Sequence, residues 1–124
     1  METPAAARII RRVAGGDLDC GAVLGSVLRL CDTPTATLVD VERVLTDGYA
    51  CVLHTEDERR RLRGRLQEQA VTVSAKGSAD EAVELRRLAQ AIARAESEIE
   101  ELRAALRTLA AKASMLRLSE ASTY

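Results

Sequence analysis

The residues of this chain with the clearest capacity for chemistry are its cysteines and its single histidine. Cys51 and His54 lie three positions apart, a spacing that on a helix can direct a thiolate and an imidazole toward one metal ion. Cys20 and Cys31 could complete a set of four ligands. We nevertheless expect no metal, because Cys20 and Cys31 share an apolar stripe with Val and Leu, where a cysteine behaves as a small hydrophobic residue. One Cys-x-x-His pair without a second close pair is also a weak zinc signature.

The sequence shows no pattern that is typical of a catalytic centre. Nucleophilic catalysis by a cysteine needs a base, and His54 is the only histidine that could serve. The glycines form no phosphate-binding loop, since Gly15-Gly16 is typical of a helix end and Gly21 and Gly25 fall inside a predicted helix. Paired carboxylates occupy solvent-facing positions with arginines one turn away. We therefore predict that the protein is not an enzyme and binds no cofactor.

One basic cluster could contact a phosphate backbone. It consists of Arg59, Arg60, Arg61, Arg63 and Arg65. Acidic residues flank it, and Glu96 and Glu98 of the facing helix are expected near Arg59. No aromatic side chains lie between the arginines to stack on bases. The formal net charge of the chain is only -1. We expect no nucleic-acid partner and keep, as the alternative hypothesis, a nucleic-acid-associated regulator that uses the basic face from Arg59 to Arg65. Arg60, Arg61 and Arg63 are its candidate contact residues.

Helices must position these residues, because the composition disfavours a sheet. Aromatic residues make up 2% of the 124 residues, whereas hydrophobic residues make up 47% and are mainly Ala, Leu and Val. No apolar stretch is long enough to cross a bilayer, no secretory signal is evident, and three cysteines argue against a disulfide framework. We expect a cytoplasmic protein with no membrane partner. The preference for arginine over lysine is typical of a GC-rich bacterial genome.

Residues 1–32 are predicted to form a small base of two helices. An early proline and a glycine pair bound the first helix. The second begins near Asp17 or Asp19 and carries an apolar stripe at helical spacing. Pro34 ends this region, and Thr33 is expected to cap the helix that follows.

The strongest pattern is a heptad repeat in the C-terminal third of the chain. Two rows of apolar residues repeat every seven positions: Leu85, Ile92, Ile99, Leu106 and Ala113, and Leu88, Ala95, Leu102, Leu109 and Leu116. A weaker repeat runs from Leu38 to Val73. We predict helices over about 35–75 and 79–118, with a tip near 76–78 and a disordered tail over 119–124.

The two repeats fit each other as a long antiparallel coiled-coil hairpin over residues 33–118. If the chain reverses at Gly77, residues whose numbers sum to about 154 face each other. Six layers are then apolar on both sides: Leu66 with Leu88, Leu62 with Ile92, Val52 with Leu102, Leu45 with Leu109, Val41 with Ala113, and Leu38 with Leu116. Ser78 and Glu81 match a capping box at the start of the last helix. Soft layers are predicted at Gly48, Thr55 and Arg59.

The apolar stripe of the last helix is wider than two helices require. Alanines occupy flanking positions where a two-stranded coil would carry charge, namely Ala89, Ala91, Ala105 and Ala110. The N-terminal helices could fold over one end of the stripe, or two chains could form a four-helix bundle, and we expect both. We therefore predict an all-α protein that acts as a protein-protein interaction module, an adaptor, assembly factor or regulatory partner. Its expected partners are a second copy, as a homodimer, and a further protein that the sequence does not identify.

Overall fold

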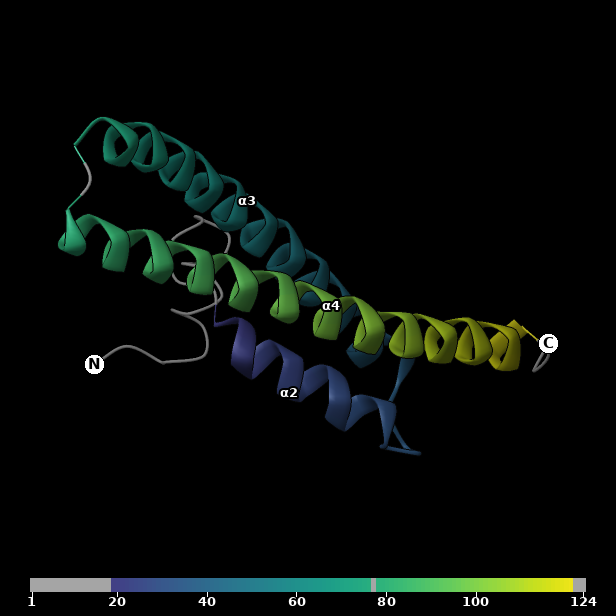
Figure 1. Ribbon diagram of the computed structural model, residues 1–124. Coiled ribbons are helices and arrows are strands. Elements are labelled where there is room, and N and C mark those ends of the chain that lie inside the picture. The colour runs from purple at the N-terminus through teal and green to yellow at the C-terminus, as the bar shows by residue number, and fades with distance from the viewer. Residues whose placement is uncertain (1–18, 77, 122–124) are drawn as a thin grey trace, which may run out of the picture. The chain divides into compact units, whose positions relative to one another are not determined.

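The computed structural model describes residues 19–76 and 78–121, and no strand occurs among them. Three helices follow one another along the chain (Figure 1): α2 (Cys20–Cys31), α3 (Leu38–Lys76) and α4 (Ala79–Ala121). The prediction of an all-helical fold is confirmed. The predicted first helix and the centre of the predicted tip, Gly77, lie outside the described residues.

The two ends of α2 are closed by side chains. The Asp19 carboxylate accepts a hydrogen bond of 3.1 Å from the backbone N–H of Ala22, which satisfies one of the open amides of the first turn. At the other end, the carbonyl of Arg29 accepts two hydrogen bonds, one of 3.1 Å from the N–H of Asp32 and one of 2.7 Å from the Thr33 hydroxyl. Asp19 is therefore the N-cap, which is one of the two starting points that the sequence predicted. Thr33 closes the helix before it and does not cap the helix after it.

The start of α3 differs from the prediction of about Thr35. The N–H of Ala36 donates to the carbonyl of Thr33 at 3.3 Å, so Pro34 occupies the second position of a turn, where its fixed φ is favourable. The Thr37 hydroxyl then accepts a hydrogen bond of 3.2 Å from the N–H of Asp40 and caps α3. The helix begins at Leu38 because the proline is used in a turn and not in the first helical turn.

α4 begins where the sequence predicts and ends later. The Ser78 hydroxyl accepts a hydrogen bond of 3.2 Å from the N–H of Glu81, which is one half of the expected capping box. The helix continues to Ala121, so the predicted tail over 119–124 is wrong for its first three residues. No proline or glycine follows Leu118, and Glu120 and Ala121 favour a helix. Residues 122–124 lie outside the described part of the chain.

The chain divides into two compact units. Unit 1 comprises the described parts of Met1–His54 and Leu102–Tyr124, and unit 2 comprises Thr55–Glu101. Unit 1 therefore contains α2 together with the first part of α3 and the last part of α4, whereas the sequence analysis set residues 1–32 apart as a base. Unit 2 contains the remainder of α3 and α4.

Within each unit, α3 and α4 run antiparallel. In unit 1, Arg117 donates to Glu42 at 2.9 Å, and Gly48 faces Leu106. In unit 2, Arg63 pairs with Glu96. In each of these two ion pairs, the two residue numbers add up to the same value. The same register therefore pairs α3 with α4 in unit 1 and in unit 2.

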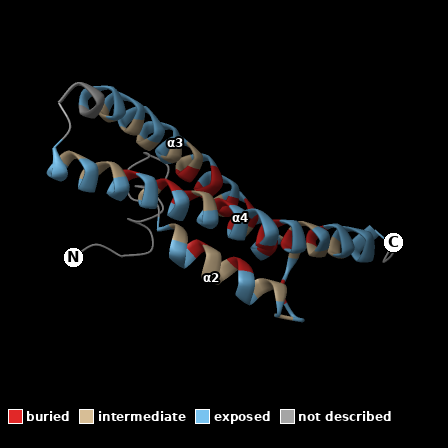
Figure 2. Cartoon of the chain, in the orientation of Figure 1, coloured by how far each residue is buried: buried red, intermediate tan, exposed pale blue. Residues whose placement is uncertain are grey.

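The core of unit 1 is shared by three helices (Figure 2). Val27 of α2, Val41 of α3 and Leu109 of α4 are completely buried. Ala105 is also buried, and Ala110 packs against the same core. In unit 1, α2 therefore covers part of the wide apolar stripe of α4, which is the first of the two arrangements expected from the sequence.

The layer of Gly48 and Leu106 is tightly packed, and the prediction of a soft layer there is wrong. A Cβ atom built on Gly48 would lie 2.4 Å from a δ-methyl of Leu106, and Leu106 is only 1% exposed. The leucine thus fills the space that a side chain at position 48 would need. In unit 2, Thr55 is buried as well.

Candidate interaction surfaces

The seam of unit 2, which has two helices, is buried more completely on one helix than on the other. Four apolar residues of α4 are buried, namely Leu88, Ile92, Ala95 and Ile99. Leu62 and Leu66 of α3 remain half-exposed, and so do Leu85 and Ala91 of α4. Full burial of a large apolar side chain contributes about 1.5–3 kcal/mol relative to exposure. A further helix laid along this seam would recover part of that free energy.

The alanines predicted to contact a second chain are divided between the two units. In unit 2, Ala89 is exposed and Ala91 is half-exposed. In unit 1, Ala105 is buried and Ala110 is half-buried, because they lie in the core that α2 helps to form. Ala91 and Ala110 are buried to a similar degree, whereas Ala89 offers more surface to another molecule than Ala105 does.

The basic cluster is paired with carboxylates at three of its arginines. Asp57 lies 3.0 Å from Arg60 and 2.9 Å from Arg61, and Arg63 pairs with Glu96. Arg59 is half-buried, and of the two carboxylates expected near it, Glu96 pairs with Arg63, one turn further along α3. The side chains of Arg60, Arg61 and Arg63 are more than half exposed, so the pairs add little stability. They do reduce the positive charge that a phosphate backbone would meet.

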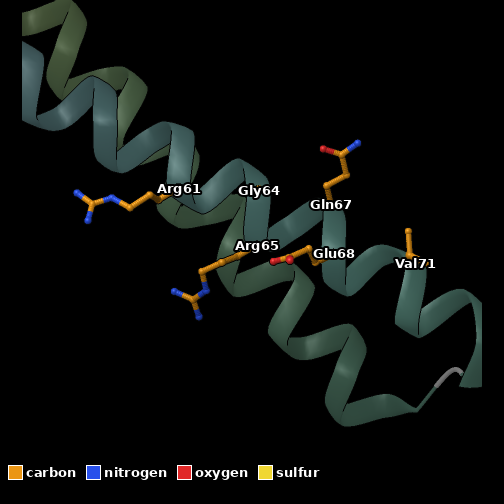
Figure 3. Close-up of a pocket in the computed structure, with 6 residues that line it drawn as sticks. All are labelled: Arg61, Gly64, Arg65, Gln67, Glu68 and Val71. Atoms are coloured by element: carbon orange, nitrogen blue, oxygen red, sulfur yellow. The ribbon is translucent and has the colours of Figure 1, made fainter.

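A shallow depression surrounds Gly64 on the outer face of α3. Its lining consists of Arg61, Gly64, Arg65, Gln67, Glu68 and Val71. Figure 3 shows Arg61 and Arg65 extending to the same side of the helix, away from Gln67 and Val71. A Cβ atom on Gly64 would meet nothing within 4 Å. The depression therefore reflects a missing side chain on one helix, and no second element builds a site around it.

The cysteines of α2 contact the backbone of the neighbouring helices. The Cys20 thiol donates to the carbonyl of Cys51 at 3.9 Å, and the Cys31 thiol donates to the carbonyl of Ala105 at the same distance. Burial raises the pKa of the Cys31 thiol above its ordinary value. The group therefore stays protonated at neutral pH and is a poor nucleophile. These contacts join α2 to both α3 and α4.

Cys51 and His54 do not belong to a cluster of ligands. Cys51 is completely buried, whereas His54 is half-exposed. Across 19–76 and 78–121, no three His, Cys, Asp or Glu side chains gather at a place that could hold a metal ion. Structural zinc sites use four ligands, so the described residues do not assemble such a site.

Lys112 of α4 forms hydrogen bonds at the C-terminal end of α2. Its Nζ donates to the carbonyl of Leu30 at 2.6 Å and also to the carbonyl of Thr33. The last carbonyls of a helix have no partner within the helix and carry a partial negative charge. A positively charged donor at this point therefore stabilises both the end of α2 and its attachment to α4.

Replacing Lys112 with methionine should weaken unit 1, because methionine keeps the apolar stem and removes the donors. We expect the free energy of unfolding to fall by about 1–3 kcal/mol, measured by urea denaturation followed by circular dichroism. The control is Arg43→Met, at a side chain that is 67% exposed, where we expect a change within about 0.5 kcal/mol. Equal effects of the two substitutions would contradict the role of Lys112.

A second hollow lies in unit 1, beside the layer of Gly48 and Leu106. It is lined by Tyr49, Val52, Arg103, Leu106 and Arg107 and has a volume of about 170 Å³. Val52 and Leu106 are buried, Tyr49 is 50% exposed, and both arginines are exposed. The heptad pattern does not predict this site. The one signal for it in the sequence is the tyrosine itself, one of two aromatic residues in the chain.

Comparison with known proteins identified no relative, since no family model, no curated protein and no solved structure matches this chain. Among the helices of the described residues, none combines the length and the apolar character needed to cross a membrane. The function is therefore argued from the surfaces of the two units.

Proposed function

We propose that the protein is a non-enzymatic protein-protein interaction module in which α3 and α4 form an antiparallel coiled-coil hairpin that self-associates and contacts a partner protein. The observation that carries this proposal is the half-exposed apolar seam of unit 2, with Leu62 and Leu66 on α3 and Ala91 on α4. A second copy that lays its own seam over this one would complete a four-helix bundle. The arrangement is symmetric, as expected for a homodimer.

The heptad positions of α4 support this proposal. Ala91 and Ala105 occupy the same heptad position, two repeats apart, and residues at one heptad position lie on one side of a coiled-coil helix. Ala105 is buried in the unit that contains α2, whereas Ala91 is half-exposed in the unit without a third helix. A helix from a second copy would bury Ala91 as α2 buries Ala105.

The substitution Ala91→Glu tests the proposal. Sedimentation velocity at micromolar concentration should give a dimer for the unmodified protein, and a charge at position 91 should raise the dissociation constant about tenfold or more, because a carboxylate would be buried without a partner. Ala93→Glu is the matched control, since Ala93 is exposed and lies on another side of α4. A monomer of unmodified protein under these conditions, or equal effects of the two substitutions, would contradict the proposal.

A further inference from the structure

We propose that the hollow beside Tyr49 binds an acidic segment of a partner protein, with an aromatic or branched apolar side chain of that segment inserted into it. This inference rests on the proposed function, because it supplies the chemistry of the partner that an interaction module would contact. The residues that carry it are Tyr49, Val52, Arg103, Leu106 and Arg107. They all belong to unit 1.

The hollow lies on a side of unit 1 that α2 leaves open. The carbonyl of Cys51 accepts a hydrogen bond from the Cys20 thiol of α2. Tyr49 lies two positions before Cys51, which corresponds to a rotation of about 200° around α3. On α4, Ala105 is the residue whose carbonyl meets α2. Arg103 and Arg107 stand two positions before and after it, and both are exposed. Among the described residues of unit 1, α2 therefore does not cover this surface.

The floor of the hollow is apolar and its size suits one side chain. Val52 is 8% exposed and Leu106 is 1% exposed. Both residues are therefore buried, and their apolar atoms form the floor of the hollow. A cavity of about 150 Å³ accommodates a benzene ring, and this hollow has about 170 Å³. Leu53, one turn after Tyr49, is 68% exposed and extends the apolar surface along α3. An aromatic or branched apolar group would bury both the floor and part of the tyrosine ring.

The rim of the hollow favours an acidic occupant. It carries two guanidinium groups and a phenol, and none of the five lining residues is acidic. Arg103 already interacts with another residue, so Arg107 provides the charge available to an occupant. Within the described part of the chain, Arg107 forms no salt bridge. Arginine binds carboxylates through two parallel hydrogen bonds, and tyrosine and arginine are the residues most enriched among those that dominate binding energy at protein interfaces. A basic segment would instead place like charges together.

The test begins with a selection from a displayed library of random peptides of about 15 residues, enough for four helical turns. The full-length protein carrying Tyr124→Phe is the target, because the chain has two tyrosines and no tryptophan and Tyr49 then becomes the sole intrinsic fluorophore. We expect enriched peptides to combine Asp or Glu with an aromatic or branched apolar residue, and to change the fluorescence of Tyr49 when they bind. Enrichment of basic or uncharged peptides, or no enrichment, would overturn the proposal.

The strongest enriched peptide is then titrated, by fluorescence anisotropy, against three variants. Arg107→Glu and Tyr49→Ala should each weaken binding about tenfold or more, whereas Arg43→Glu, a matched charge reversal on another exposed arginine of unit 1, should leave it unchanged. Equal binding by all three variants would overturn the proposal. Sedimentation separates this result from the proposed self-association: if Arg107→Glu dissociates the dimer, a second copy fills the hollow and the inference is wrong, whereas an unchanged dimer with weakened peptide binding supports it.

Discussion

Replacement of Gly48 with alanine is expected to destabilise the protein, whereas the same replacement at Gly64 should stabilise it. Both glycines lie inside α3, and alanine favours a helix interior over glycine by about 0.8–1.0 kcal/mol. A methyl group at position 64 enters open space, but one at position 48 would lie 2.4 Å from a δ-methyl of Leu106. Overpacking of this kind costs about 1–3 kcal/mol.

The comparison of the two glycine variants isolates the steric effect, because the gain in helix propensity is common to both. We expect Gly64→Ala to be more stable than Gly48→Ala by about 1–3 kcal/mol in the free energy of unfolding, measured by urea denaturation. In a background that carries Leu106→Ala, the clash is removed and the two glycine variants should no longer differ. Equal stability in the unmodified background would show that Leu106 rotates away without cost, against its tight burial.

Replacement of Leu109 with alanine is the second substitution with a large expected effect. Leu109 is completely buried in the core that α2, α3 and α4 share. Removing a buried leucine side chain forfeits its transfer free energy and leaves a cavity, and together these cost about 2–5 kcal/mol. We expect a loss of this size in the free energy of unfolding, measured by thermal or urea denaturation followed by circular dichroism.

Leu118→Ala provides the matched control for that experiment. Leu118 lies on the same helix and is 68% exposed, so its removal should change the stability by about 0.5 kcal/mol or less. The heptad pattern makes the same distinction, because Leu109 is a seam position and Leu118 is not. A loss at Leu118 as large as that at Leu109 would contradict the described packing of unit 1.

The local features of the fold were predictable because they depend on neighbouring residues. Asp19 caps α2 and Ser78 caps α4 through hydrogen bonds within one turn. The heptad period predicts that Gly48 faces Leu106, and in unit 1 it does. Sequence reasoning failed where a local signal has two uses, as at Pro34, which supports a turn in place of a helix start.

The candidate sites were less predictable because each combines residues from two helices. Gly48 read alone indicates a hole, yet in the structure Leu106 fills that space from the other helix. Tyr49 falls outside the heptad seam, and its neighbours Arg103 and Arg107 come from α4. Glu96 of α4 likewise pairs with Arg63 of α3, a contact between two helices.

By itself, the sequence determined that the described chain is helical, approximately where its helices begin and end, and the antiparallel register of α3 and α4. These properties depend on periodicity and capping, which involve residues that are close together in the sequence. Tertiary structure alone decided which parts of the apolar stripe are covered and which stay open. The placement of α2 depends on contacts between residues far apart in sequence, such as Cys31 with Ala105 and Lys112 with Leu30. Those contacts bury Ala105 and leave Ala91 and the hollow beside Tyr49 open to other molecules.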